Sequence, residues 1–257
     1  RIEELLLDTP IVAPPSENAN INWISNQALG EKGFERIIGE KSTLLDIAFL
    51  KEGVRVSKAV ARITVTFSDG KYYGTGFLIN HNLVLTNHHV LFDHDNNDEK
   101  ATSVVLWFDY ENSFSGGLIS KYEVQGDPSC IFGEKSSDWA VIKLAESMEE
   151  HFPYLKLGGM MPSENERVYI IQHPNGTTKQ IGMHNNIVRY VDDKIIQYYT
   201  DTDGGSSGAP VFNAKWEVIA LHQGWNFVNH STYKEYRNQG VNINRVIQEL
   251  GLHNVIL

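Results

Sequence analysis

Three short segments carry side chains that could act together in nucleophilic catalysis. VLTNHHVLF, residues 84–92, ends a predicted strand with two histidines, and SSDWAVIKL, residues 136–144, opens another with an aspartate. DGGSSGAPVF, residues 203–212, holds two adjacent serines among glycines. A serine hydroxyl is a poor nucleophile until a histidine takes its proton, and a carboxylate must orient that histidine. The chain order, with spacings of 49 and 69 residues, predicts a nucleophilic triad of His89, Asp138 and Ser207.

The same serine-rich turn also fits the nucleophile elbow of α/β-hydrolases, as Gly204-x-Ser206-x-Gly208. That elbow needs a helix after the serine and the chain order serine, acid, histidine. Pro210 and the strand-like segment VFNAKWEVIAL follow here instead, and strands and helices do not alternate along the chain. The elbow is therefore disfavoured, although three histidines lie downstream of the serines: His222, His230 and His253.

Composition limits the class of protein. The 257 residues include 41% hydrophobic ones, enough for a substantial core, and carry a formal net charge of −10. An acidic chain argues against a nucleic-acid partner, and the lack of an apolar run near 18 residues argues against a membrane partner. Cys130 is the single cysteine, which predicts a reducing, cytoplasmic location without an internal disulfide. Because the sequence opens on Arg1, we expect a processed or truncated chain that lacks an N-terminal domain or regulatory partner.

Residues 1–55 are predicted to form an N-terminal arm or linker, because prolines and mixed polarity interrupt any periodic pattern near the start. Within this arm, Ser42 is expected to cap a short helix through TLLDIAFLKE. Gly53 is expected to end that helix, so that the strands begin a few residues later.

From residue 56 the pattern changes to short strands rich in Val, Ile and Tyr. Ser68-Asp69-Gly70-Lys71 is a hairpin signal between two of them. Many short strands with one terminal helix predict an all-β fold of two barrels, the first over 56–150 and the second, with the helix at 242–250, over 151–257. The expected strands are 59–67, 72–79, 82–86, 103–110, 139–144, 167–173, 186–191, 194–200 and 216–223.

The three segments resemble the signature segments of chymotrypsin-fold (trypsin-like) serine proteases. GTGFLINHNLVLTNHHV ends with the Leu-Thr-x-x-His pattern of that family, and residues 205–210 match its Gly-x-Ser-Gly-[small]-Pro pattern. The similarity spans about residues 56–250 and is nearest to the disulfide-free bacterial branch that includes glutamyl endopeptidases. It implies a double β-barrel with a C-terminal helix and an N-terminal extension. It also implies the roles of the triad, namely base, orienting acid and nucleophile for His89, Asp138 and Ser207.

The resemblance further implies a reaction and the groups that would stabilise it. The N–H groups of Gly205 and Ser207 would form an oxyanion hole, in which one donor is typically worth about 3–4 kcal/mol. The reaction would be hydrolysis of protein peptide bonds through an acyl-enzyme, with no metal or organic cofactor. We expect a regulated bacterial protease module that binds a protein or peptide as an added strand along His222, Gln223 and Gly224. A catalytically inert binding domain of the same fold is the alternative.

Two interpretations stay open for the pocket that binds P1, the substrate side chain before the cleaved bond. Asp201, six residues before Ser207, lies where trypsins keep the aspartate that binds Arg or Lys. Thr202 and His222 match positions with which glutamyl endopeptidases hold an acidic side chain. Alternatively, Asp201 is a turn residue and His222 is hydrogen-bonded inside the barrel. The acidity of the chain slightly favours a basic P1 side chain.

Two further patterns suggest functions that neighbouring residues disfavour. Arg36-Ile37-Ile38-Gly39 resembles the activation site of digestive trypsins, but Ser206 replaces the aspartate that pairs with the freed amine. A buried ammonium would stay unpaired, so we expect that cleavage there is not the switch. The loop DHDNNDE, residues 93–99, has an Asp-x-Asp-x-Asn spacing that hints at calcium. It lacks the glycine and the distal glutamate of a helix-loop-helix calcium site, so no metal is expected.

Overall fold

The computed structural model describes residues 44–119, 121–231 and 233–253. The chain divides into two units, residues 1–46 and 47–257, and the description below concerns the second unit. No helix in the described ranges is long and apolar enough to cross a membrane. The predicted cap Ser42 and the segment Arg36–Gly39 lie outside the described residues.

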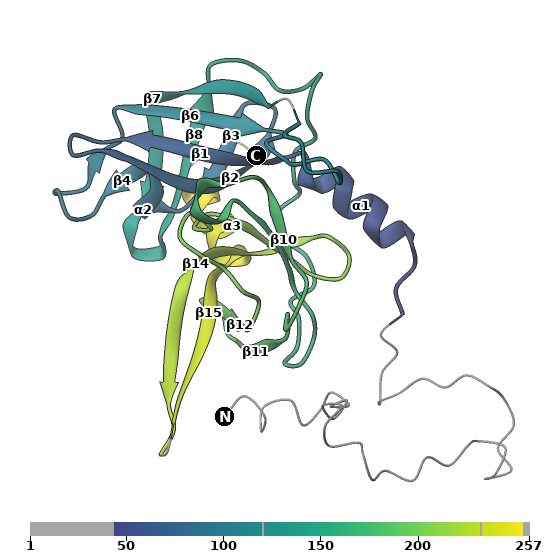
Figure 1. Cartoon of the computed structure of the whole chain (residues 1–257). Helices are drawn as coiled ribbons and strands as arrows, with labels where there is room; N and C mark the ends of the chain where they lie inside the picture. The colour runs from purple at the N-terminus through teal and green to yellow at the C-terminus, as the bar shows by residue number, and fades with distance from the viewer. Residues whose placement is uncertain (1–43, 120, 232, 254–257) are drawn as a thin grey trace, which may run out of the picture. The chain divides into compact units, whose positions relative to one another are not determined.

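Six antiparallel strands close the first barrel (Figure 1). Its order is β1-β2-β3-β8-β7-β6, and the predicted turn at Asp69-Gly70 joins β1 to β2, in which Thr66 pairs with Lys71. Apolar side chains such as Ile63 and Leu85 fill its interior with no exposed surface, as expected for a small barrel. The strands are β1 Val60–Thr66, β2 Lys71–Asn80, β3 Leu83–Thr86, β6 Ser103–Phe108, β7 Tyr122–Glu134 and β8 Trp139–Leu144.

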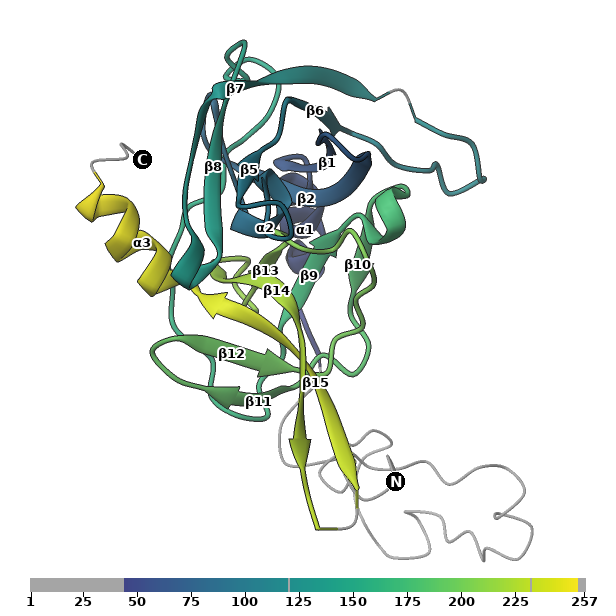
Figure 2. The same cartoon turned by 90° about the vertical axis from the view of Figure 1, so that its left-hand side faces the viewer.

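The second group of strands forms one seven-stranded sheet of order β10-β9-β13-β14-β15-β12-β11. Among the described residues, the backbone pairing runs from β10 to β11 without closing into a ring. The long hairpin of β14 and β15 extends beyond the rest of the sheet (Figure 2). The strands are β9 Tyr169–Gln172, β10 Gln180–Gly182, β11 Val188–Val191, β12 Ile195–Tyr198, β13 Pro210–Phe212, β14 Val218–Asn229 and β15 Lys234–Asn242.

Short elements connect the strands around the first barrel. Helix α2, His88–Leu91, follows β3 directly, and the small strands β4 Phe92–Asp93 and β5 Glu99–Lys100 pair with each other. Two 3-10 turns, η3 Lys135–Ser137 and η4 Pro174–Gly176, precede β8 and follow β9. These connections lie at strand ends, where barrel folds commonly carry functional side chains.

The C-terminal helix α3, Ile243–Leu252, confirms the predicted terminal helix. It buries Ile243, Val246 and Leu250, and the Asn242 side chain accepts a hydrogen bond from the Asn244 N–H as its cap. Glu249 accepts hydrogen bonds from the side chains of Ser137 and Trp139, which belong to the first barrel. Helix α3 therefore lies beside β8 and joins the second sheet to the first barrel (Figure 2).

Helix α1, Ala48–Ser57, differs from the predicted helix because Gly53 lies in its interior and does not end it. A Cβ atom at Gly53 would lie 2.5 Å from Cζ2 of the Trp216 ring, so the glycine allows the helix to pack closely against the indole. The indole N–H of Trp216 also donates to the Phe49 carbonyl at 2.8 Å. Tertiary packing explains this glycine better than a helix stop does.

Candidate active site

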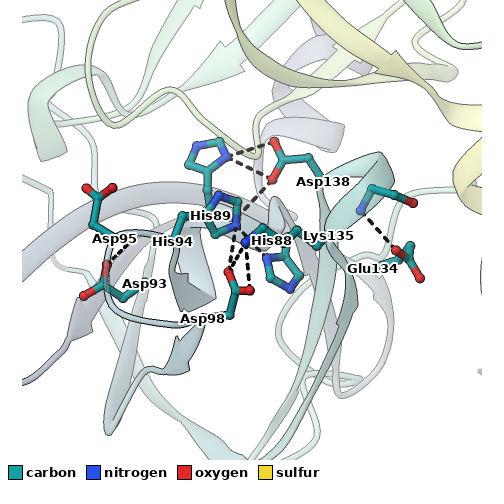
Figure 3. A network of polar contacts seen from close by, with 10 residues as sticks. His88, His89, Asp93, His94, Asp95, Asp98, Glu134, Lys135 and Asp138 are labelled. Carbon is teal, nitrogen blue, oxygen red and sulfur yellow. Dashed lines mark hydrogen bonds and ion pairs between the residues drawn. The ribbon is translucent and has the colours of Figure 1, made fainter.

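His89 and Asp138 meet at one end of the first barrel. Strand β3 pairs with β8 so that Thr86 opposes Ala140, which places the residues just after β3 and just before β8 side by side. The His89 Nδ1 atom lies 2.8 Å from Oδ2 and 3.0 Å from Oδ1 of Asp138, and the His89 backbone N–H donates to Oδ1 at 3.0 Å (Figure 3). A buried carboxylate that contacts Nδ1 in this way holds the imidazole in one orientation and one tautomer.

The backbone around Asp138 is shaped for this contact. Asp138 has φ +47°, a left-handed conformation that Asp and Asn tolerate better than most residues. The Asn87 amide donates to the Asp138 carbonyl at 2.8 Å, which fixes the backbone of the acid to the residue two before the histidine. The side chain of His89 stays 33% exposed while that of Asp138 is 8% exposed. A substrate can therefore reach the base but not the acid.

Ser207 lies in the loop between β12 and β13, and this loop packs against the barrel that carries the histidine. The Thr75 N–H of β2 donates to the Ser207 carbonyl at 2.9 Å. A Cβ atom at Gly208, where φ is +85°, would lie 2.1 Å from Thr86 Oγ1 and 2.2 Å from the Thr75 carbonyl oxygen. Only glycine fits this approach. Within the described residues, no hydrogen bond joins Ser207 Oγ to His89, and such bonds commonly tighten when substrate binds.

The N–H groups of Gly205 and Ser207 have no acceptor among the described residues. Their neighbours are engaged, because the Gly204 N–H donates to Asp203 Oδ1 and the Ser206 N–H to the Asp203 carbonyl. The Gly208 N–H donates to the His222 carbonyl at 2.9 Å. Unpaired backbone donors that flank a serine are the groups that an oxyanion hole requires.

Thr75 joins the two halves of the site, although no sequence pattern singled it out. Its hydroxyl donates to the Gly205 carbonyl at 2.8 Å and accepts from the His173 N–H at 3.0 Å. With the carbonyl of Gly205 fixed in this way, the peptide plane between Gly205 and Ser206 is fixed too. A threonine in a predicted strand offers no signal of such a role, because the contact depends on how the loop of one half meets a strand of the other.

His222, predicted to bind substrate, is 2% exposed. Its Nδ1 atom lies 2.8 Å from the Tyr198 hydroxyl. Burial lowers the pKa of His222 to about 3, His89 acts in the same direction, and a backbone hydrogen bond with Gln239 opposes the shift. The imidazole is therefore neutral near pH 7. Tyr198 has no sequence signature that would have revealed it as this partner.

Two other residues predicted to bind substrate, Gln223 and Thr202, form side-chain hydrogen bonds with residues of β15. Gln223 lies at a β-bulge between His222 and Gly224, and its side-chain oxygen accepts from the Gln239 amide at 3.3 Å. Thr202 donates its hydroxyl hydrogen to Asn238 Oδ1 at 2.9 Å, which ties the segment before the nucleophile to β15. Asn238 is thus a further neighbour of this region that sequence reasoning missed.

Asp201 lines a surface hollow of about 380 Å³ beside β9 and β10. The Gln172 amide donates to the Asp201 carbonyl at 3.0 Å. The hollow also includes Thr202 but not His222, so Asp201 and His222 do not line the same hollow. Its lining residues are Gln172, Pro174, Asn175, Thr177, Gln180, Asp201, Thr202 and Asp203.

A closed β-barrel that carries a histidine–aspartate pair, packed against a second sheet that carries a serine in a glycine-rich loop, is the architecture of the chymotrypsin-like class of peptidase folds. Residues 74–221 match the family of the trypsin-like peptidase domain. The chain belongs to this family of trypsin-like serine proteases and lies near its glutamyl endopeptidase branch. The predicted family, the all-β fold and the terminal helix are confirmed.

Individual relatives agree with this assignment. The chain is 34% identical over 209 residues to the uncharacterized protein y4fB of Sinorhizobium fredii, covering 74% of this chain but only 31% of that relative's length. It is 26% identical to a glutamyl endopeptidase of Staphylococcus epidermidis, covering 77% of this chain and 67% of the relative. The active form of the Rv3671c protease of M. tuberculosis matches in fold, with a TM-score of 0.58 at 16% identity over 86% of this chain and 92% of that one.

Proposed function

We propose that the chain is a serine endopeptidase in which Ser207 is the nucleophile, His89 the general base and Asp138 the orienting acid. The observation that carries the proposal is the contact of His89 Nδ1 with the Asp138 carboxylate at 2.8 Å. The unpaired N–H groups of Gly205 and of Ser207 itself support the proposal from the other half of the site. This arrangement is what acyl transfer requires, namely an oriented base and donors placed for a developing negative charge.

The proposed reaction has two balanced steps. In the first, Ser207 Oγ bonds to the peptide carbonyl carbon while its proton moves to Nε2 of His89, and the N–H groups of Gly205 and Ser207 bind the oxyanion. The histidine then gives this proton to the departing amine, which leaves an acyl-enzyme. In the second, water attacks the ester carbonyl as His89 takes one of its protons. That proton returns to Ser207 Oγ when the carboxylic acid product leaves.

The substrate would bind as an extended strand beside β14. Strand β13 pairs with β14 only from Val218 to Leu221, and beyond His222 the described residues of β14 pair with β15 alone. The edge at Gln223 and Gly224 is therefore free for a peptide backbone. Addition of a strand to a free edge supplies main-chain hydrogen bonds that do not depend on substrate sequence.

For the P1 side chain, we favour an acidic residue over the basic one that the acidity of the chain slightly favours. The resemblance implies that Thr202 and His222 would hold an acidic side chain, and the relatives named glutamyl endopeptidases support this choice. The neutral imidazole of His222 would gain a proton as the substrate carboxylate arrives, because an adjacent negative charge favours the charged imidazole. Asp201 opposes this choice only if it enters the same pocket, and it lines a hollow without His222. A P1-scanning peptide library tests the choice, and cleavage after Arg that Asp201→Ser abolishes would reject it.

A fluorophosphonate probe tests the proposed nucleophile directly. We expect covalent labelling of the wild-type chain and of Ser206→Ala, with the adduct on Ser207 by peptide mapping, and no labelling of Ser207→Ala. Ser206 is the matched control, because its hydroxyl accepts only from the Asp203 N–H at 3.2 Å. Labelling lost in Ser206→Ala but kept in Ser207→Ala would move the nucleophile by one residue. No labelling of any variant would favour an inert binding domain.

A further inference from the structure

A second group of potential ligand atoms lies beside the triad but is not part of it. His88, in α2, and His94 and Asp98, in the loop between β4 and β5, bring their side chains together on the first barrel (Figure 3). They form the one group of three or more His, Cys, Asp or Glu side chains with metal-ligand spacing in the described part of the chain. The triad uses none of them, because His89 Nδ1 faces Asp138 whereas His88 Nδ1 faces His94.

The distances are close to those of a metal centre. The Nδ1 atom of His88 lies 2.8 Å from Nε2 of His94, and that Nε2 atom lies 3.9 Å from Oδ1 of Asp98. All three ligand atoms lie within 4.8 Å of one another. A tetrahedral zinc ion with bonds of about 2.0–2.1 Å separates its ligand atoms by about 3.3 Å. To seat the ion, the first distance must widen and the second must shorten by about half an ångström each, and the distance from His88 to the Asp98 carboxylate, at most 4.8 Å, must shorten by up to about 1.5 Å.

The first histidine is already held in place for binding. His88 is 5% exposed, and its ring stacks on the Phe92 ring, with centroids 3.9 Å apart and an interplanar angle of 5°. His94 and Asp98 are more exposed, with side-chain exposures of 34% and 35%. One ligand is thus fixed by packing while two face solvent, so that an ion can enter without opening the core.

We propose that His88, His94 and Asp98 form a binding site for a zinc ion. Two imidazoles and one carboxylate are ligands that zinc prefers, whereas calcium takes oxygen ligands. Because the two ring nitrogens are within hydrogen-bond distance, one of them carries the proton between them. When the ion binds, that imidazole shifts to its other neutral tautomer, in which the proton is on the second ring nitrogen, and both facing nitrogens are free to bind the ion. Water fills the fourth position.

Lys135 competes with the ion for the carboxylate. Its ammonium lies 2.7 Å and 2.8 Å from the two oxygens of Asp98. The contact occupies the oxygen that would bind zinc, so the ammonium must move aside when the ion arrives. The exposed Lys135 side chain is free to do so, because exposed ion pairs are typically worth only about 0.2–1 kcal/mol.

The Asp-x-Asp-x-Asn spacing in the same loop, which resembles a calcium-binding pattern, involves different residues. Asp93 and Asp95, which start the Asp-x-Asp-x-Asn spacing, belong to no group with metal-ligand spacing in the described residues. Asp93 Oδ1 instead accepts from the Asp95 N–H at 3.0 Å, which is a local turn contact. Asp95 is therefore a control residue, with the same side chain as Asp98 in the same loop but outside the proposed site.

Calorimetric titration of the full chain, without an affinity tag and after chelator treatment, tests the proposal with zinc chloride alone. We expect one ion per chain. His94→Ala and Asp98→Asn should raise the dissociation constant by at least about tenfold, while Asp95→Asn should leave it unchanged. Lys135→Gln should lower it by up to about fivefold, because the competing ammonium is gone. Calcium chloride should give no binding to this site.

Several results would overturn the proposal. These are the absence of zinc binding to the wild-type chain, equal affinities for wild type and Asp98→Asn, and weaker binding by Lys135→Gln. Asp98→Asn preserves the shape of an exposed side chain. The far-ultraviolet circular dichroism spectrum of this variant, recorded in the presence of chelator, shows whether the fold is kept. The test does not depend on peptidase activity, so it stands whether or not Ser207 is a nucleophile.

Discussion

The two halves of the candidate site are held by different kinds of contact. On the first barrel, His89 and Asp138 meet through their side chains, within a register that β3 and β8 impose. On the second sheet, the loop around Ser207 is positioned by backbone hydrogen bonds and by two glycines with positive φ, Gly205 and Gly208. The acid and the base therefore depend on side-chain chemistry, whereas the nucleophile depends on backbone shape. Substitutions should separate these two dependences.

The largest effect is expected from Asp138→Asn. The asparagine keeps the shape of the side chain and tolerates the positive φ of +47°, so the fold should remain. An amide N–H facing Nδ1 forces the wrong imidazole tautomer and cannot stabilise the imidazolium. We expect kcat to fall by about 10⁴-fold, measured on a cleavable peptide, with an unchanged unfolding midpoint.

Asp109→Asn is the matched control for that change. Asp109 also has positive φ, at +50°, and belongs to the same half of the molecule, but it does not contact His89. Asp109 is partly buried but contacts no member of the triad, so its substitution should leave kcat within about twofold of wild type even if it alters stability. Activity near wild type in Asp138→Asn would remove Asp138 from the proposed mechanism.

A backbone change in the other half should have the next largest effect. A Cβ atom at Gly205, where φ is +86°, would lie 2.9 Å from the His173 carbonyl oxygen and 3.0 Å from the Gly176 nitrogen. Gly205→Ala should therefore turn its N–H away from the oxyanion and lower kcat by about 10²–10³-fold.

Gly204→Ala makes the same chemical change one residue earlier. A Cβ atom there meets only Asn175 Oδ1, at 3.5 Å, which is ordinary contact. We expect this variant to keep most of the wild-type kcat, measured on the same peptide. Equal losses in Gly204→Ala and Gly205→Ala would mean that the loop does not depend on the backbone shape of Gly205.

The sequence predicts the catalytic motifs of both halves but not the contacts between distant segments. The His89, Asp138 and Ser207 segments stand out because each is a local motif at a strand end, and strand periodicity gives the all-β fold with its terminal helix. Contacts between distant segments could not be predicted from the sequence. Examples are the packing of Gly53 against Trp216 and the hydrogen bond from Thr202 to Asn238. Local patterns report an element, but tertiary contacts decide which side chains meet.

Thr75→Val probes the contact between the halves, where no local motif exists. The change keeps the shape of the side chain and removes the hydroxyl between the Gly205 carbonyl and the His173 N–H. Both groups would lose a buried partner, so we expect a loss of about 1–3 kcal/mol in the free energy of unfolding, together with a lower kcat.

Thr102→Val is its control within the first barrel. The exposed Thr102 hydroxyl donates to the Thr66 carbonyl at 2.9 Å, without reaching the second sheet. Its replacement should change the free energy of unfolding by no more than about 0.5 kcal/mol and leave kcat unchanged. If urea unfolding shows equal effects for the two variants, Thr75 does not link the halves in the way proposed.

The last prediction concerns the pH dependence of stability that arises from a buried, neutral histidine. His173 is fully buried, with Nδ1 3.0 Å from the Thr177 carbonyl and Nε2 without a partner among the described residues. Burial lowers the pKa of His173 from 6.5 to about 3. Between these two values the unfolded chain binds the proton and the folded chain does not. His173 therefore lowers the free energy of unfolding as pH falls from 6.5 towards 3, by about 1.4 kcal/mol per pH unit, and has no such effect above that range.

His173→Asn removes this titration and keeps a donor for the Thr177 carbonyl. Urea unfolding at about pH 7 and about pH 5 should show that wild type loses about 2 kcal/mol more stability than the variant between the two conditions. His222, whose pKa is also lowered to about 3, contributes equally to both proteins and cancels in the difference. Equal losses in the two proteins would show that His173 takes up a proton in the folded state, behind the nucleophile loop. His173 would then bind a proton, as His89 does in the proposed reaction. The contrast between a buried histidine that stays neutral and an exposed histidine that acts as a base would no longer hold.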